Sequence, residues 1–287
     1  MKKAMIPLVL LFLGTTFSMC TTEKESKEIG LQLYSVRDAM EEAPKETVRE
    51  VGEMGYTFVE AAGYADGKFY GMEPEEFTSL VEESGMKFLS SHTGQDLPDS
   101  ASWDETMEWW DECIEAHAKA GVQYIVQPWM GDEGYDSIEG LEKYCEYFDA
   151  VGEKCNEAGI VFGYHNHDKE FSELEGEIIY DYMLKNTDPA KVFFQIDLYW
   201  IQEGGENVVD YFNSYPGRFP LWHVKDEKEL GQSGQMDFEE AFDHAEMAGL
   251  DYMIVEVEKY DYDPLESVRM SLEYLQDADF VEASYHN

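Results

Sequence analysis

The sequence predicts an α/β protein built as a single (β/α)8 barrel, a TIM barrel, over residues 28–287. From residue 28 on, short apolar runs rich in β-branched and aromatic residues alternate with longer amphipathic runs that carry many acidic residues. Eight such pairs follow one another without a break in composition. Several of the longer runs end in a glycine just before the next apolar run, and glycine commonly caps the carboxyl end of a helix.

The apolar runs are the strand candidates, because each is short and rich in Val, Ile, Phe and Tyr. In chain order they are IGLQLYS (29–35), YTFVEA (56–61), MKFLSSH (86–92), VQYIVQP (122–128), IVFGYHN (160–166), KVFFQID (191–197), FPLWHVK (219–225) and DYMIVEVE (251–258). The runs between them predict helices near 43–54, 74–84, 103–120, 138–158, 173–186, 206–214, 237–248 and 264–276. The capping glycines stand in VGEMGY, EESGMKF, AKAGVQY, NEAGIVF and EMAGLDY.

A doubly wound open sheet is the rival fold, and it explains the sequence less well. Such a sheet usually has fewer strands, and a nucleotide-binding example needs a glycine-rich turn after its first strand. Here the first strand runs into QLYSVRD, and neither GxGxxG nor GxxxxGK[ST] occurs anywhere. Dinucleotide-binding and P-loop functions therefore lack their main signal.

The first residues, MKKAMIPLVLLFLGTTFSMC, resemble a bacterial lipoprotein signal. Two lysines precede an apolar run that is too short to span a bilayer, and Cys20 follows directly. We therefore expect a signal peptide over residues 1–19, lipidation of Cys20 and a polar tether over residues 20–27. The predicted location is the periplasm or the outer membrane, with membrane contact only through that anchor. Phe17 and Met19 depart from the usual preferences of the signal, so simple secretion stays open.

The composition is strongly acidic, with 20 basic and 62 acidic residues and a formal net charge of −42. Such a surface repels phosphate backbones, so we expect no nucleic-acid partner. It also disfavours a sugar phosphate unless the site supplies its own cations. Solubility, for instance in a salty habitat, is an equally good reason for the charge.

The cysteines beyond Cys20 offer no metal-binding pattern. Cys145 and Cys155 fall in one predicted helix, roughly 15 Å apart along its axis, so they cannot pair with each other. Cys113 and Cys145 could meet across neighbouring helices, but nothing in the sequence favours that pairing. No CxxC or CxxH spacing indicates a cysteine zinc site.

Polar residues gather where the predicted strands end, which is where the active sites of such barrels lie. In chain order they are Gln32, Tyr34, Arg37, Glu60, His92, Gln127, His165, Asn166, His167, Glu170, Asp197, Trp200, His223, Lys225, Glu256 and Glu258. Because residues two apart on a strand share a face, His165 pairs with His167, and His223 with Lys225.

Asp197, His223 and Glu256 are the strongest candidates for metal ligands. Two carboxylates and an imidazole from separate strands form an oxygen and nitrogen site suited to Mn²⁺, Co²⁺, Mg²⁺ or Zn²⁺. Each also has a simpler interpretation, since an acid or histidine at a strand end can cap the next helix or bond a loop.

Five segments together resemble the sugar phosphate isomerase/epimerase family, whose fold is a xylose isomerase-like barrel. They are QLYSVRD, YHNHDKEF, FFQIDLYW, LWHVKD and IVEVE, and the similarity runs from residue 29 to about residue 276. The resemblance implies a divalent metal held by two glutamates, an aspartate and a histidine. It assigns the aspartate to Asp197, the histidine to His223 and the last glutamate to Glu256.

The fourth ligand is less clear, because many relatives have an ENH-like triplet where this chain has His165-Asn166-His167. Either His165 replaces that glutamate, or Glu170 reaches back from the following loop. We favour Glu170, since a carboxylate there could also serve as the second proton-transfer group.

A second departure concerns the sixth strand, after which ketose epimerases of the family carry Asp-x-x-His. Here Trp200 stands in the position of that histidine. Its indole has one N–H to donate, but it can stack on a sugar ring. With Tyr34, Trp129 and Tyr199 it indicates a roomier site, suited to a glycoside, although ordinary packing is the alternative for such aromatics.

The resemblance implies metal-assisted proton abstraction next to a carbonyl. Glu256 and Glu170 would act as base and acid, and a metal would stabilise the enediolate. The expected substrate-binding residues are Tyr34, Arg37, His92, His165, His167, Trp200 and Lys225. Because export takes the protein away from phosphorylated sugars, we expect an unphosphorylated sugar or a keto-glycoside.

Three outcomes stay open at this point. The same proton transfer leads to isomerisation or epimerisation, and it also serves a lyase or hydratase acting on 3-keto-glycosides. A surface sugar-binding protein without turnover is the alternative from outside enzymology. A nuclease, known among distant barrel relatives, would need a basic groove that a charge of −42 argues against.

Overall fold

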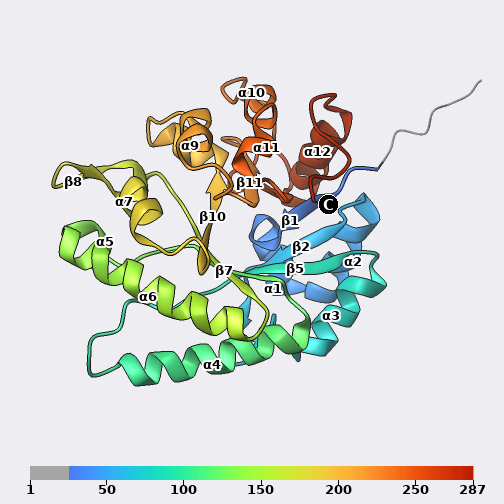
Figure 1. Cartoon of the computed structure of the whole chain (residues 1–287). Helices are drawn as coiled ribbons and strands as arrows, with labels where there is room; N and C mark the ends of the chain where they lie inside the picture. Colours follow the sequence, from blue (N-terminus) through green and yellow to red (C-terminus); the bar gives the residue numbers. More distant parts are fainter. Residues whose placement is uncertain (1–25, 287) are drawn as a thin grey trace, which may run out of the picture.

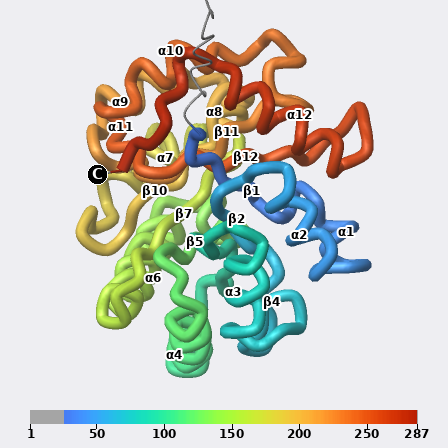
Figure 2. The backbone as a smooth tube through the Cα atoms, turned by 90° about the vertical axis from the view of Figure 1, so that its right-hand side faces the viewer, coloured from blue at the N-terminus to red at the C-terminus, as the bar shows by residue number. Residues whose placement is uncertain are grey.

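The computed structural model describes residues 26–286, and its centre is a closed barrel of eight parallel strands (Figure 1). Around the barrel the strands follow the order β1-β12-β11-β10-β7-β6-β5-β2. Figure 2 shows the strands at the centre, ringed by helices. The predicted (β/α)8 fold is confirmed. The strands are β1 (Ile29–Gln32), β2 (Phe58–Ala61), β5 (Lys87–His92), β6 (Tyr124–Gln127), β7 (Val161–His165), β10 (Val192–Asp197), β11 (Leu221–Lys225) and β12 (Tyr252–Glu256).

The helices cover the outside of the barrel and connect each strand to the next. They are α1 (Arg37–Glu42), α2 (Pro44–Met54), α3 (Pro74–Glu83), α4 (Trp103–Ala120), α5 (Glu133–Asp136), α6 (Ile138–Glu157), α7 (Ile179–Asn186), α8 (Leu198–Glu203), α9 (Val208–Ser214), α10 (Phe238–Phe242), α11 (Ala245–Ala248) and α12 (Pro264–Asp277). Two small hairpins, β3 (Tyr64–Ala65) with β4 (Lys68–Phe69) and β8 (Glu173–Leu174) with β9 (Glu177–Ile178), decorate the loops.

The strand register determines which side chains meet at the barrel mouth. Neighbouring strands pair Asp197 with His223 and Lys225 with Glu256. One step further around, Gln195 pairs with His165. All residues of β10 and β11 are buried, as expected for strands covered on both faces. The polar ends of four strands, β7, β10, β11 and β12, are therefore held side by side by the backbone hydrogen bonds of the barrel.

Several elements differ from the sequence prediction. The first strand stops at Gln32, because its side-chain oxygen accepts from the Tyr34 amide and starts a 3-10 turn. The helix expected from residue 173 begins at Ile179, since Glu175 and Gly176 adopt positive φ and close the β8–β9 hairpin. The helix expected over 237–248 is broken between Phe242 and Ala245, and α8 is an additional short helix.

The two ends of the described chain meet at the amino-terminal opening of the barrel. The Lys27 ammonium donates to the carbonyls of Leu275 and Ala278, at the carboxyl end of α12. The Glu28 amide donates to the Ala283 carbonyl at 2.8 Å. Contact with the barrel thus begins at Lys27, the last residue of the predicted tether. The predicted signal peptide over residues 1–19 and Cys20 lie outside the described residues.

Cys113, Cys145 and Cys155 are all buried and free, so the possible pairing of Cys113 with Cys145 is not formed. Within residues 26–286, every helix is too short or too polar to cross a lipid bilayer.

Candidate metal centre and substrate pocket

Four side chains converge at the carboxyl end of the barrel. His165, Asp197, His223 and Glu256 come from β7, β10, β11 and β12, and each offers one ligand atom within 4.8 Å of the others. Within this cluster His223 Nδ1 lies 3.4 Å from a Glu256 oxygen and 3.9 Å from an Asp197 oxygen. All four side chains are at most 4% exposed. The strand ends thus form a compact, dry cluster of two imidazoles and two carboxylates.

Three atoms of this cluster lack any hydrogen-bond partner although they are buried: His165 Nδ1, Asp197 Oδ2 and His223 Nδ1. Buried polar atoms are normally satisfied, so a group of them pointing at one place calls for an occupant. Ligands about 2.1 Å from one ion lie at most about 4.2 Å apart, close to the spacing of this cluster. The donor set therefore fits a divalent ion such as Mn²⁺, Co²⁺, Mg²⁺ or Zn²⁺.

Asp197 is both a helix cap and a candidate metal ligand, the two roles that the sequence allowed. Its Oδ1 accepts from the amides of Tyr199 and Trp200 at 2.9 and 2.8 Å and so caps α8. Its Oδ2 is the free atom that faces the cluster. The Asp197 amide donates to Asn166 Oδ1, which ties the end of β10 to the loop after β7. The cap fixes the carboxylate in one orientation and leaves one oxygen for a ligand role.

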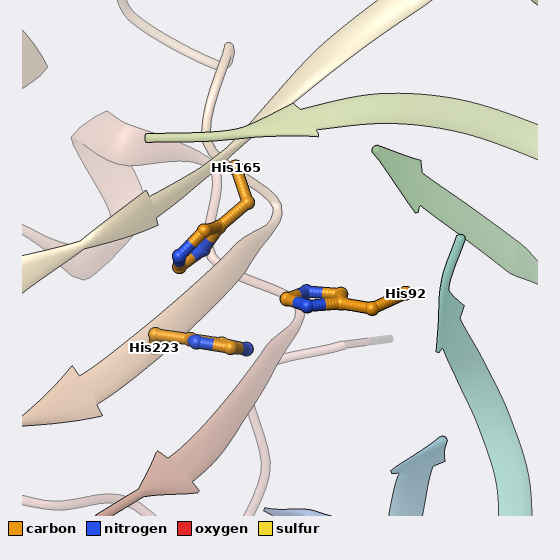
Figure 3. A group of neighbouring side chains, drawn as sticks. All are labelled: His92, His165 and His223. Carbon is orange, nitrogen blue, oxygen red and sulfur yellow. The ribbon is translucent and has the colours of Figure 1, made fainter. Parts of the chain in front are cut away.

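His92, His165 and His223 form a second, overlapping group, shown in Figure 3. The rings of His92 and His223 stack at 5.1 Å with an interplanar angle of 15°, and His165 leans over both. However, Nε2 of His223 lies 2.6 Å from Glu60, and Nε2 of His92 lies 2.7 Å from Gln195. These nitrogens already have partners, so the four-residue cluster is the better metal site.

Burial and charge shift the pKa values of the cluster in opposite directions. Burial alone would lower the pKa of His223, but Glu256 and Glu60 outweigh it and raise that pKa to about 10. Burial raises the pKa of Asp197. For Glu256, burial opposes ionisation, but Lys225 and His223 hold its pKa well below the usual range. Burial keeps the pKa of His165 well below its usual value. A metal-free site thus holds a proton on His223 that a cation would displace.

Glu170, which we favoured as the fourth ligand, lies outside the cluster. One of its oxygens accepts from the hydroxyls of Tyr135 and Tyr164, both at 2.6 Å, and the other from the His167 amide at 2.9 Å. With both oxygens engaged, it shapes the loop after β7, and His165 occupies the position near the other ligands. This arrangement could not be predicted, because Tyr135 comes from the α5 segment, far away in the chain.

Lys225 lies beside the cluster and is only 2% exposed. Its ammonium contacts Glu256 at 2.9 Å and Glu258 at 2.6 Å, and it stands 5.3 Å from the centre of the Trp200 ring. Burial opposes its charge, yet the surrounding carboxylates raise its pKa above the usual value. The centre of the Trp200 ring lies 5.7 Å from that of His167, and Trp200 does not line the pocket over the cluster.

A pocket of about 280 Å³ opens over the cluster and reaches the outside of the barrel mouth. Tyr34 and Trp129, 44% and 39% exposed, flank its outer part. The Arg37 guanidinium stacks on the Tyr34 ring and donates a hydrogen bond to the Tyr260 hydroxyl, and Arg37 does not line the pocket. The lining residues are Tyr34, Ala62, His92, Pro128, Trp129, His165, His167, Glu256 and Glu258. A larger hollow of about 450 Å³ at the opposite barrel opening has no histidine in its lining.

Two buried side chains near the ligand cluster, those of Glu60 and Gln195, were not predicted to have a role. The sequence placed Glu60 at a strand end, but nothing in it singled out Gln195. Gln195 stands two positions before Asp197 on β10, so strand alternation could have placed it on the same inward face.

The fold and the cluster define a barrel enzyme class in which strand-end carboxylates and histidines surround one small-molecule pocket. Residues 48–278 match the family described as xylose isomerase-like TIM barrel, and the chain belongs to this family. A solved sugar phosphate isomerase/epimerase from Parabacteroides distasonis ATCC 8503 is 32% identical, with a TM-score of 0.85. The match covers 90% of this chain and 100% of that one.

Two further proteins resemble this chain at lower identity. An inosose dehydratase from Geobacillus kaustophilus (strain HTA426) is 23% identical over 214 residues, which cover 68% of this chain and 67% of that protein. The 3-keto-D-glucoside 4-epimerase of E. coli shares the fold, with a TM-score of 0.67, 18% identity, and coverage of 88% of this chain and 100% of that one.

The raised pKa of His223 predicts that metal binding releases protons. Because the metal-free imidazole keeps its proton up to about pH 10 and a metal needs the deprotonated nitrogen, affinity must rise with pH. Each displaced proton should lower the Kd for Zn²⁺ or Co²⁺ about tenfold per pH unit between about pH 6 and 8. Calorimetry in buffers of different ionisation enthalpy measures the number of protons released. A Kd that does not change with pH would contradict the proposed proton occupancy.

Proposed function

We propose that the protein is a divalent-metal-dependent sugar isomerase or epimerase that moves a proton at the carbon next to a carbonyl. The observation that carries this proposal is the cluster of His165, Asp197, His223 and Glu256, which holds three unsatisfied buried atoms and contributes His165 and Glu256 to the lining of a pocket. A divalent ion there would supply positive charge to stabilise an enediolate.

Glu256 is the group best placed to take the proton. Its carboxylate lines the pocket, and its lowered pKa keeps it ionised when the neighbouring side chains are buried around it. Lys225 holds one of its oxygens at 2.9 Å and so fixes the direction of the carboxylate. A base fixed in this way needs no reorganisation before it removes a proton.

His167 replaces Glu170 as our candidate for the second proton-transfer group. It lines the pocket, and burial lowers its pKa, so the ring is neutral at neutral pH. Glu170 holds the His167 amide and thereby positions this residue from behind. A carboxylate at the end of β12 and a neutral imidazole in the loop after β7 then face the substrate, and a neutral imidazole can both accept and return a proton.

The pocket favours an unphosphorylated substrate. Among the described residues that line it, two are glutamates and none is a lysine or an arginine. The nearby cations are engaged elsewhere, Lys225 by Glu256 and Glu258, and Arg37 by Tyr260. A phosphate would meet negative charge without a partner, which is costly in a buried site. A neutral sugar or keto-glycoside fits this chemistry.

A lyase or dehydratase acting on keto-glycosides is the second candidate. The fifth barrel strand offers His165 where many relatives have a carboxylate, which leaves one carboxylate and one imidazole to move protons. That pair suits removal of a proton by Glu256 and protonation of a leaving hydroxyl by His167. The similarity to an inosose dehydratase supports the same alternative.

Solvent deuterium exchange tests the proton-transfer chemistry directly. The protein is loaded with Mn²⁺ or Co²⁺ and incubated in D₂O with free sugars, 3-keto sugars and their glycosides, and NMR is recorded after the metal is chelated. We expect exchange next to the carbonyl, and Glu256→Gln should slow it at least about 100-fold, because it removes the base. Metal content of each variant is measured in parallel.

Glu258→Gln is the matched comparison, because Glu258 contacts Lys225 but lies outside the ligand cluster. Its exchange rate should fall much less than that of Glu256→Gln. Undiminished exchange in Glu256→Gln would refute the base assignment. Absence of exchange on every sugar, with sugar binding retained, would favour a binding protein, and an unsaturated product would favour the lyase.

Trp129 and Tyr34 support a substrate with a second ring, because they present aromatic faces at the outer end of the pocket. Trp129→Ala should raise KM for a keto-glycoside with an aromatic aglycone about fivefold, or about 1 kcal/mol, and leave KM for the free keto sugar unchanged. Met247→Ala, which removes an apolar side chain that is 45% exposed on α11, serves as control. Equal effects on both substrates would exclude an outer subsite at Trp129.

We also propose that the protein is exported and anchored through Cys20, on the strength of the apolar run that precedes it. Expressed in its native type of host, the wild type should partition into the membrane fraction, and Cys20→Ala should lose that association. Fractionation followed by detection of the barrel measures both. A wild type found entirely in the soluble exported fraction would favour simple secretion.

A further inference from the structure

Glu60 is a fully buried carboxylate at the end of β2, and its hydrogen-bond and ion-pair partners within residues 26–286 include no lysine or arginine. Taking a carboxylate out of water costs several kcal/mol, so a barrel interior keeps one only if its surroundings compensate for the loss of hydration. An apolar side chain would fill the same space without that cost. The position therefore needs a reason other than packing.

The contacts of Glu60 come from four other strands. Oε1 accepts from Gln32 at 2.8 Å and lies 2.6 Å from His223 Nε2, while Oε2 accepts from Ser90 at 2.5 Å and from Gln195 at 2.8 Å. His92 Nε2 adds a contact of 3.1 Å to Oε1. Both oxygens are surrounded by donors, so Glu60 has no oxygen left to bind a metal itself.

The contact with His223 decides which ring nitrogen of that residue carries a proton. A carboxylate can only accept, so Nε2 must donate to it. In the neutral ring the lone pair is then on Nδ1, the nitrogen that faces Glu256 and Asp197 in the ligand cluster. An imidazole held in this way by a carboxylate has its tautomer and its ring orientation fixed before a cation arrives.

Glu60 also helps to position His92, the ring that stacks on His223. The Gln195 amide donates to Glu60 and accepts from His92 Nε2, so it connects His92 to the same carboxylate that contacts His223. The His92 ring lies parallel to the His223 ring, as Figure 3 shows. Rotation of His223 would therefore break its contact with Glu60 and its stacking on His92 together.

We propose that Glu60 is the positioning residue of the metal centre, which fixes His223 with Nδ1 directed at the cation. This proposal rests on the metal site of the proposed function, although Glu60 touches neither metal nor substrate. It assigns the buried Glu60 carboxylate to the chemistry above it, and not to the stability of the barrel alone.

The test measures Co²⁺ binding by four proteins, with the Co²⁺ absorption bands as the readout during titration. They are the wild type, Glu60→Gln, Ser90→Ala and Glu229→Gln. Glu60→Gln should weaken binding about 10- to 100-fold and shift the bands, since the ligand histidine loses its fixed orientation. Ser90→Ala removes a contact to Oε2 only and should change Kd less than about threefold. Glu229 is a buried carboxylate that holds Ser267 and the Asp261 amide, so Glu229→Gln should leave Kd unchanged.

Glu60→Gln binding Co²⁺ as tightly as the wild type, with the same spectrum, would overturn the proposal. So would an equal loss of affinity in Glu229→Gln, because it would reduce the effect to general destabilisation. Thermal unfolding of each metal-free variant, monitored by circular dichroism, shows which variants are folded.

A measurement on the metal-free wild type separates this proposal from the proposed function and needs no variant. NMR of ¹⁵N-labelled histidine rings should show the His223 Nε2 proton strongly shifted downfield by its 2.6 Å contact with Glu60. If that signal is present but the wild type binds no divalent ion, the positioning by Glu60 holds and the metal-dependent function fails. If the signal is absent, the positioning proposal fails whatever the protein binds.

Discussion

The structure depends on how the barrel neutralises the charges that it buries at its carboxyl end. Glu60, Asp197 and Glu256 are almost completely buried there, and they carry three potential negative charges against the one positive charge of Lys225. Glu256 and Glu60 outweigh the effect of burial on His223 and raise its pKa to about 10, so this imidazole adds positive charge. Burial raises the pKa of Asp197 and so opposes its ionisation. These shifts explain how acids and imidazoles are tolerated together in the interior of the barrel.

Most of the fold could be predicted from the sequence, because the signals that define it are local. Glycines such as Gly55, Gly121 and Gly249 adopt positive φ at helix ends, and apolar runs of strand length follow them. The prediction was wrong where tertiary geometry decides, as at Glu175 and Gly176, where a hairpin replaces the first turns of an expected helix. No periodicity in the chain distinguishes those two outcomes.

The candidate site shows the same contrast. Some of its side chains have positions that follow from the local sequence, and others have positions that depend on contacts from distant parts of the chain. Asp197, His223 and Glu256 end buried strands, so their inward direction follows from alternation and register. Glu170 lies in a loop, and the direction of its carboxylate is set by Tyr135, a residue from a different connection. Sequence reasoning could place Glu170 near the mouth but could not tell that two tyrosines would occupy it.

The meeting of both chain ends at the amino-terminal opening also has a consequence for access to the pocket. Lys27 and Ala283 lie at the base of the barrel, whereas Tyr34 and Trp129 stand at its rim. The amino-terminal end of the described chain therefore lies at the base of the barrel, on the side opposite to the rim of the pocket. Attachment to a bead or an electrode through the amino terminus should therefore leave the rim open to dissolved sugars, whereas attachment through the loops after the strands would obstruct it.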